Sequence, residues 1–278
     1  MEIEVTTLTE NTAGIGDCLA EWGLSILVET DTIRVLLDTG ASISAVHNAD
    51  TLGIELSKID KIVLSHGHYD HTGGLHDMLR KMNKEIEIIA HPDIWTSKYA
   101  HSDEVKDKFI GIPFAQEELE NRGAHFLLTK EPVHINDFIM TTGEIPMITS
   151  YEEIENNLCI KEGGILQQDK LDDDLALVID TEFGLVVILG CAHRGIVNTL
   201  RHAQKITGKE FVYAVIGGTH LLRASDERIE RTIADLKEMG IQKLGVSHCT
   251  GFHASARLAR EFEGVFYLNN AGSRITLP

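Results

Sequence analysis

The 278-residue chain has little cysteine, little positive charge and no long apolar run. Its four cysteines, Cys18, Cys159, Cys191 and Cys249, are far apart and form no C-x-x-C pair, which excludes a disulfide framework and indicates a reducing compartment. No apolar run approaches the roughly eighteen residues of a membrane-spanning helix. The first residues do not follow the pattern of a signal peptide. We therefore expect a cytoplasmic protein that has no membrane partner.

Basic residues are scarce: 25 lysines and arginines stand against 43 aspartates and glutamates, and the formal net charge is −18. Nucleic-acid binding needs a basic surface for the phosphates, so no nucleic-acid partner is expected. A small-molecule substrate is expected instead, because bound metal ions can supply positive charge locally within an acidic protein. A homo-oligomer stays open.

Apolar runs of strand length alternate with helical patterns over most of the chain. Strands are expected at residues 2–8, 25–29, 33–37, 61–65, 87–90, 175–180, 185–189, 211–216 and 243–246, and helices at 43–53, 73–82, 196–207, 226–239 and 254–263. This order indicates an α/β fold with helices on the sheet faces. No low-complexity linker divides the chain, so one domain is expected over residues 1–278.

The middle of the chain, at about residues 92–172, is less regular and holds four of the five prolines. We interpret it as additional strands together with an insertion that shapes a pocket. A helix is expected near residues 103–109.

Three histidines and an aspartate lie within six residues, His66-Gly67-His68-Tyr69-Asp70-His71, directly after the apolar run at 61–64. Imidazole and carboxylate together suit zinc, iron or manganese. His66 and His68 are two residues apart, so in extended chain both point the same way and can chelate one ion. Asp70 and His71 follow where the chain turns into a helix, and we expect them to hold a second ion. The alternative is a chance cluster on a solvated loop.

Polar residues of similar kind follow four other expected strands. They are Asp38 after residues 33–37, Cys191 and His193 after 185–189, His220 after 211–216, and His248 after 243–246. Ligands of α/β proteins lie at the carboxyl ends of the strands. We therefore expect these five side chains to converge on the histidine cluster.

These motifs resemble those of a known family. The pattern H-x-H-x-D-H at 66–71, with Leu37-Asp38-Thr39-Gly40 upstream, resembles the metallo-β-lactamase superfamily. The segments 68–75, 190–198, 217–221 and 248–251 resemble the branch of that superfamily named for 7,8-dihydropterin-6-methyl-4-(β-D-ribofuranosyl)aminobenzene 5′-phosphate synthase. The resemblance covers most of the chain and is best over residues 24–90 and 174–270.

The resemblance implies a fold and a set of metal ligands. The implied fold is a four-layer αββα sandwich of the metallo-β-lactamase type, with a two-metal site on its edge. His66 and His68 would hold the first metal. Asp70, His71 and His248 would hold the second.

The chain departs from the common pattern of the superfamily in two places. The usual Gly-Asp, whose carboxylate bridges the metals, is Gly190-Cys191 here, and no His-x-x-Gly-His segment precedes residue 175. We expect His193 to replace the missing histidine. Cys191 is expected to be either a thiolate ligand or a small buried apolar residue.

Three further groups have expected roles. Asp38 is expected to accept a hydrogen bond from the metal loop and so to orient it. His220 is expected either to bind substrate or move a proton, or to be a structural histidine of the core. The acidic run Asp172-Asp173-Asp174 is expected to be a solvated loop.

Together these expectations favour a metal-dependent hydrolase that acts on a phosphate-containing or pterin-like small molecule. Its cofactors would be two divalent transition ions, with zinc expected first and iron or manganese as alternatives, and they would activate a water. Asp70 would orient the water, and His220 would give a proton to the leaving group.

Two other function classes stay open. One is a diiron redox protein, which is disfavoured because His68 stands where such relatives are expected to carry a glutamate. The other is a metal-binding ligand sensor without catalysis.

Overall fold

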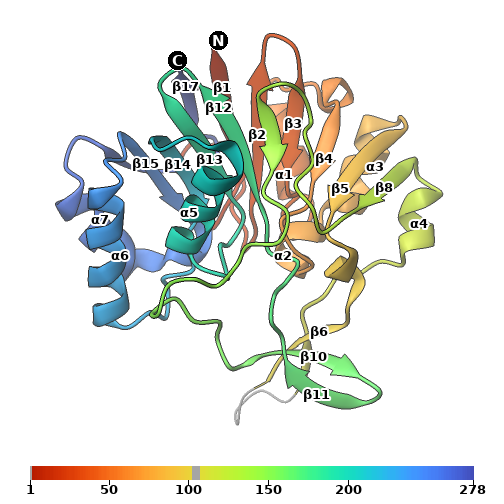
Figure 1. Ribbon diagram of the computed structural model, residues 1–278. Coiled ribbons are helices and arrows are strands. Elements are labelled where there is room, and N and C mark those ends of the chain that lie inside the picture. Colours follow the sequence, from red (N-terminus) through yellow and green to blue (C-terminus); the bar gives the residue numbers. More distant parts are fainter. Residues whose placement is uncertain (1, 102–106) are drawn as a thin grey trace.

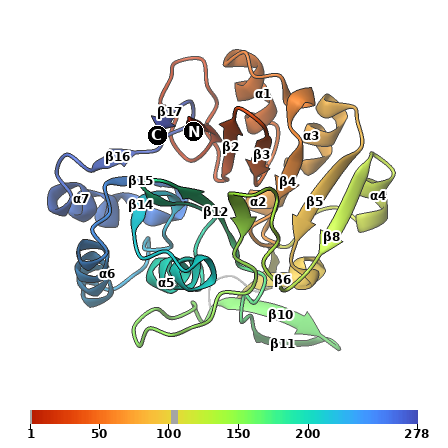
Figure 2. The same cartoon turned by 45° about the horizontal axis from the view of Figure 1, so that its top comes forward.

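The structure is a computed structural model that describes residues 2–101 and 107–278. Two large sheets lie face to face, and helices cover the outer face of each sheet (Figures 1 and 2). The predicted four-layer αββα sandwich is therefore confirmed.

The first sheet has seven strands in the order β17-β1-β2-β3-β4-β5-β8. They are β1 (Ile3–Thr9), β2 (Ser25–Thr30), β3 (Arg34–Leu37), β4 (Lys61–Val63), β5 (Ile86–Ala90), β8 (Ala124–Leu128) and β17 (Arg274–Leu277). Strands β3, β4, β5 and β8 run parallel, so their carboxyl ends share one edge. The helical segments beside this sheet are α1 (Ser44–Thr51), η1 (Leu56–Lys58), α2 (Tyr69–Thr72), α3 (Leu75–Met82), η2 (Pro92–Trp95) and α4 (Gln116–Glu120).

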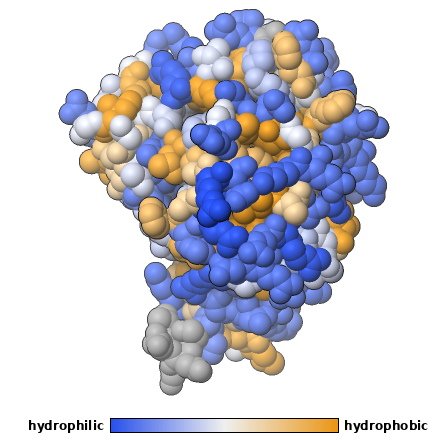
Figure 3. Space-filling view, turned by 90° about the vertical axis from the view of Figure 1, so that its left-hand side faces the viewer, coloured by the Kyte–Doolittle hydropathy of each residue, from blue (hydrophilic) through white to orange (hydrophobic). Residues whose placement is uncertain are grey.

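The second sheet has six strands in the order β16-β15-β14-β13-β12-β9. They are β9 (Ile139–Thr141), β12 (Ala176–Thr181), β13 (Gly184–Leu189), β14 (Val212–Gly218), β15 (Lys243–Ser247) and β16 (Phe266–Leu268). The helical segments are α5 (Ile196–Thr207), α6 (Asp226–Glu238), η3 (His248–Thr250) and α7 (Gly251–Glu261). Figure 3 views this side, and most of its surface is hydrophilic. Within the described ranges, no helix combines the length and apolar character needed to cross a membrane.

The strands are apolar on both faces because each large sheet is covered on both sides. In β13, Val186 and Ile188 join the core between the sheets, whereas Val187 and Leu189 join the core under the helices α5, α6 and α7. The first sheet alternates in the same way along each strand. Because successive side chains of a strand point to opposite faces, one short apolar run serves two cores.

A small four-stranded sheet stands apart at the end of the sandwich away from both termini (Figure 1). It consists of β6 (Lys98–Ala100), β7 (Lys108–Phe109), β10 (Leu158–Glu162) and β11 (Ile165–Gln168). The helix expected near residues 103–109 lies partly outside the described residues. At Lys108–Phe109 that expectation was wrong, because these two residues pair with Tyr99–Ala100 as antiparallel strands.

Most expected elements agree with the structure to within three residues at each end. The strand expected at 61–65 ends at Val63, and the last helix begins at Gly251 rather than at residue 254. The short strands β16 and β17 were not expected. They have three and four residues, too few to show an apolar period, yet β17 pairs with β1 and closes one edge of the first sheet.

Gly74 fixes the chain between the histidine cluster and α3. Its N–H donates to the carbonyl oxygen of Gly40 at 3.0 Å. A Cβ at Gly74 would lie 2.0 Å from the backbone oxygen of Thr39. We expect Gly74→Ala to lower the free energy of unfolding by about 2 kcal/mol or more, because the backbone must shift. Urea unfolding measures the change.

The control is Gly16→Ala, since a Cβ at Gly16 would meet nothing within 4 Å. Its free energy of unfolding should stay within about 0.5 kcal/mol of the wild type. A Gly74→Ala protein as stable as this control would contradict the packing described.

Candidate metal centre

The histidine cluster follows β4 directly, and four ionisable side chains of it are buried: His66, His68, Asp70 and His71. Extended chain at His68 leads into α2, so His66 and His68 precede the helix while Asp70 and His71 lie on its single turn. His66 Nε2 lies 3.0 Å from His68 Nδ1. The donors of the extended segment (His66 and His68) and those of the helical turn (Asp70 and His71) therefore lie close together.

His193 joins the first pair from the other sheet. It follows β13, and its Nε2 lies 3.2 Å from Nε2 of His66. The ligating atoms of His66, His68 and His193 all lie within 4.8 Å of one another. The expected replacement for the missing family histidine is thus in contact with the pair that it would complete.

A second set consists of Asp70, His71 and His248, whose ligating atoms also lie within 4.8 Å of one another. Asp70 Oδ2 lies 3.3 Å from His248 Nε2 and 4.0 Å from His71 Nε2. His248 begins the short turn η3 after β15. Residues far apart in the sequence therefore meet at one edge of the sandwich, as predicted from the polar residues that follow the strands.

Cys191 lies between these two sets. Its Sγ is 3.1 Å from Nε2 of His71, and it also groups with His66. The side chain is buried, and burial raises the pKa of the Cys191 thiol well above its ordinary value. A thiol in this place would lose its proton on contact with a divalent metal.

The chemistry of the donors fits metal binding. Burial lowers the pKa of His66 and His193 and brings that of His68 to about 3, so these imidazoles are neutral. Among the described residues, no hydrogen-bond partner meets the buried Nε2 of His248, the nitrogen that faces Asp70. Burial opposes ionisation of Asp70, yet the nearby His71 and His248 lower its pKa. Neutral imidazoles and an ionised carboxylate are the ligands that zinc and similar ions take.

Known proteins with similar sequences share this architecture. The model of the metallo-beta-lactamase superfamily matches residues 23–145. The 7,8-dihydropterin-6-methyl-4-(beta-D-ribofuranosyl)-aminobenzene-5'-phosphate synthase of Methanocaldococcus jannaschii is 37% identical, over 98% of this chain and 96% of that protein.

The chain belongs to the metallo-β-lactamase superfamily.

Two further known proteins are similar over most of the chain. An uncharacterised protein of Methanocaldococcus jannaschii is 32% identical over 92% of this chain and 94% of its own length. The crystal structure of Tm1679, described as a metal-dependent hydrolase of the beta-lactamase superfamily, superposes with a TM-score of 0.84 at 28% identity, covering 98% of each chain. Divalent metal binding is the general property of the superfamily, and the centre described above contains donors for it.

The buried carboxylate of Asp38 orients the histidine cluster at residues 66–71, as expected. Asp38 Oδ2 accepts a hydrogen bond from His71 Nδ1 at 2.6 Å. Its two oxygens also accept hydrogen bonds from the backbone N–H and the hydroxyl of Ser65, each at 2.7 Å. Burial opposes protonation of His71, but Asp38 and Asp70 outweigh it and raise the pKa of His71 to about 9.

The expectation that residues 172–174 form a solvated loop was wrong for two of the three. Asp173 and Asp174 are 1% exposed. Asp173 Oδ2 accepts a hydrogen bond from the N–H of Gly67, between the two chelating histidines, at 2.8 Å. Burial raises the pKa of Asp174 to about 7, and no partner for its Oδ1 lies in the described part of the chain.

Lys98 of β6 explains why Asp173 can be buried. Its Nζ lies 2.9 Å from Asp173 and 2.7 Å from Asp169, and all three side chains are nearly inaccessible. No pattern in the sequence pairs these residues, because lysine and aspartate are usually solvated. The small sheet thus supplies the lysine that pairs with Asp173, and Asp173 in turn holds the backbone of the histidine cluster.

His220 lies beside the first set of donors, with its ring centroid 4.0 Å from that of His193. Its Nε2 lies 3.6 Å from Glu155, and its backbone N–H donates to Cys249 Sγ at 3.3 Å. Burial lowers the pKa of His220, but Cys249 and Glu155 outweigh burial and raise it. Cys249 itself was not expected at the site, although it directly follows His248 in the sequence and groups with it and with Cys191.

Several strand ends at this edge are conformationally strained. Asp38, Ala192, His220 and His248 have φ values of 59°, 53°, 50° and 53°. Non-glycine residues in this left-handed region cost about 1–3 kcal/mol each unless the surrounding structure imposes it. Here the strain turns side chains of four separate strands toward one volume.

We expect Lys98→Met to destabilise the protein by about 3–5 kcal/mol, because the carboxylates of Asp169 and Asp173 would stay buried without their cation. Thermal or urea unfolding measures the loss. The control is Lys58→Met, whose exposed pair with Glu55 should leave the stability close to that of the wild type. Equal stability of the two variants would show that the buried group contributes nothing.

Proposed function

We propose that this protein is a metal-dependent hydrolase that binds two divalent transition ions and acts on a phosphate-containing or pterin-like small molecule. The observation that carries the proposal is the pair of adjacent three-residue donor sets, with Cys191 between them. A single structural ion is four-coordinate and would use only four of these seven donors.

His66, His68 and His193 would hold one ion, and Asp70, His71 and His248 the other, with zinc proposed first. When bound, such ions supply charge that acidifies a water molecule and stabilises the leaving oxygen. Cys191 takes the place of the bridging carboxylate that the superfamily commonly has.

The surrounding residues set the orientation and the protonation of these ligands. Asp38 holds Nδ1 of His71 and leaves Nε2 facing the centre. The hydroxyl of Ser65 lies 2.9 Å from Nδ1 of His66, and Asn11 Oδ1 lies 2.9 Å from Nδ1 of His248. These three histidines are thus fixed through the nitrogen that does not face the centre.

Two side chains are suited to proton handling. Asp70 is ionised, so its oxygens can accept a hydrogen bond from a nucleophilic water and orient it. His220 has a raised pKa and lines a cavity of about 200 Å³ together with Trp22 and Cys249. A protonated His220 could give its proton to a leaving group in that cavity.

The substrate class is supported by the relatives. The synthase with 37% identity is named for a product that carries a dihydropterin and a 5'-phosphate. A substrate with phosphate or pterin chemistry, rather than a nucleic acid, also suits the net charge of −18.

The same relative supports a second candidate, a synthase that joins two small molecules in this site. In that case a group of a second substrate, instead of water, would attack the electrophilic centre of the first and displace its leaving group, and Asp70 would orient the nucleophile.

Hydrolysis tests the proposal. Protein loaded with zinc, manganese or iron should hydrolyse members of a panel of phosphomonoesters and phosphodiesters. Asp70→Asn should lower kcat by about 100-fold or more, since the orienting carboxylate is lost. Asp50→Asn, an exposed change on α1, is the control and should keep the wild-type rate.

Absence of hydrolysis by metal-loaded protein over the whole panel would contradict the hydrolase proposal. Formation of a joined product from a pterin and an aromatic ribosyl phosphate would then favour the second candidate.

Cobalt substitution tests the role of Cys191. Cobalt(II)-loaded protein should show a thiolate-to-cobalt charge-transfer band in the near ultraviolet, because a coordinating thiol is deprotonated. Cys191→Ser should remove the band, whereas Cys159→Ser, a buried change in β10, should leave it. A band that survives Cys191→Ser would show that Cys191 does not bind the metal and only packs in the core.

A further inference from the structure

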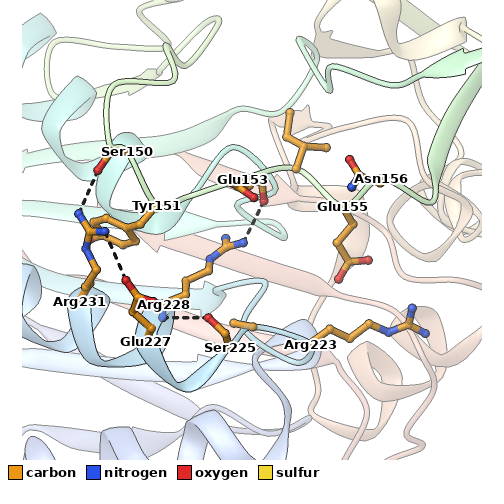
Figure 4. A pocket seen from close by; sticks show the side chains of 12 residues that line it. Ser150, Tyr151, Glu153, Glu155, Asn156, Arg223, Ser225, Glu227, Arg228 and Arg231 are labelled. Atoms are coloured by element: carbon orange, nitrogen blue, oxygen red, sulfur yellow. Dashed lines mark hydrogen bonds and ion pairs between the residues drawn. The ribbon is translucent and has the colours of Figure 1, made fainter.

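A cavity rich in arginine lies next to the metal centre. It has a volume of about 420 Å³ and is formed by the segment 150–156 and by residues 223–231 at the start of α6 (Figure 4). Arg223, Arg228 and Arg231 line it. In a chain with 25 basic residues among 278 and a net charge of −18, three arginines around one cavity are a local concentration of guanidinium donors, although Glu153, Glu155 and Glu227 line it too and the formal charges balance.

This cavity adjoins the one beside the metal donors. Glu155 and Arg223 line both the arginine-rich cavity and the smaller cavity that contains His220 and Cys249. A ligand of substrate size could therefore reach from the donors into the arginine-rich cavity.

Arg228 has unused hydrogen-bonding capacity. Its Nη1 donates to the backbone oxygen of Glu153 at 2.9 Å. Its Nε and Nη2 are buried, and neither meets a hydrogen-bond partner within residues 2–101 and 107–278. Buried guanidinium donors without partners are costly, so a water or ligand oxygen that reached this pair of N–H groups would stabilise Arg228.

The other two arginines differ in how they are held. Arg231 donates to Ser150 Oγ at 2.9 Å and stacks on the ring of Tyr151 at 4.4 Å, so its guanidinium is fixed (Figure 4). Arg223 is exposed, and no ion pair to it occurs within the described ranges. One arginine is thus fixed, one is half-buried with free donors, and one is free to close over a ligand.

Among the described residues, no carboxylate of the cavity accepts a hydrogen bond from the side chain of Arg223 or Arg228, although the charges of Glu152, Glu153 and Glu155 act on Arg228. Glu227 lies 3.9 Å from Arg231, and Glu155 lies 3.6 Å from His220. Arg228 meets the backbone of Glu153 and not its carboxylate. Room for an acceptor therefore remains at Arg228 and Arg223.

We propose that this cavity binds the phosphate group of a phosphate monoester substrate, with Arg228 and Arg223 as the anchoring residues. A guanidinium presents parallel N–H donors that match two phosphate oxygens, and such charge-assisted pairs are strong and directional. The inference rests on the proposed function: the phosphate monoester held by the arginines is not the group that is hydrolysed, and the bond broken at the metal donors is a second bond of the same substrate.

Calorimetric binding of ribose 5-phosphate and of ribose tests the proposal, on zinc-loaded protein and on protein treated with a chelator. Ribose 5-phosphate should bind in both states, at least about tenfold more tightly than ribose, because the arginines do not depend on the metal. Arg228→Met and Arg223→Gln should each weaken that binding by about tenfold. Arg223 is exposed, so its variant reports on binding even if Arg228→Met folds poorly.

The matched control is Arg260→Met, an 88% exposed arginine of α7 outside the cavity, which should bind as the wild type does. Binding that disappears with the chelator and ignores both arginine variants would place the phosphate on the metals and overturn the proposal. Absence of binding in both states would also overturn it. Binding is measured at equilibrium and needs no turnover. It can therefore be absent from a protein that hydrolyses the panel, or present in a protein that hydrolyses none of it.

Discussion

The carboxylate of Asp38 is the contact on which the site depends. It is fully buried, and it joins the end of β3 to Ser65 and to His71 through three hydrogen bonds. The second sheet packs directly on this contact: a Cβ at Gly190 would lie 2.1 Å from Ser65 Oγ and 3.1 Å from Asp38 Oδ2. Only glycine allows β13 to come so close. The same contact therefore orients one ligand and sets the distance between the two sheets that supply the others.

Both ends of the chain complete the centre. His248 lies 238 residues after Glu10, which accepts its backbone N–H at 3.0 Å, and Asn11 lies 2.9 Å from its ring. Glu10 is buried, and this burial raises its pKa, so the contact with His248 is shielded from water. The small sheet adds Lys98 from a third direction. A centre with such distant supports forms only when both sheets and the small sheet are in place, which explains why charged groups unsuited to an isolated loop are stable there.

The sequence predicted the elements that bear chemistry and the support from Asp38, and it missed the other supports. Continuous apolar runs with His, Asp or Cys at their ends identified β3, β4, β13, β14 and β15, because strands covered on both faces leave no polar alternation to mislead. The spacing of His66 and His68 predicted a shared direction, and the structure brings them together with His193. Asp173 and Lys98 could not be predicted, because each is buried only through the other and their separation in the chain is arbitrary. The arginine-rich cavity likewise joins a loop and a helix that no pattern connects.

A metal titration with two variants tests the central claim most directly. Chelator-treated wild-type protein should bind about two zinc ions per chain, and His248→Ala and His193→Ala should each retain about one, since each removes a ligand from a different set. His125→Ala, an exposed histidine of β8, should still bind about two. A wild-type protein that binds one ion or none, or variants that bind as many ions as the wild type, would contradict a centre built from two sets of donors.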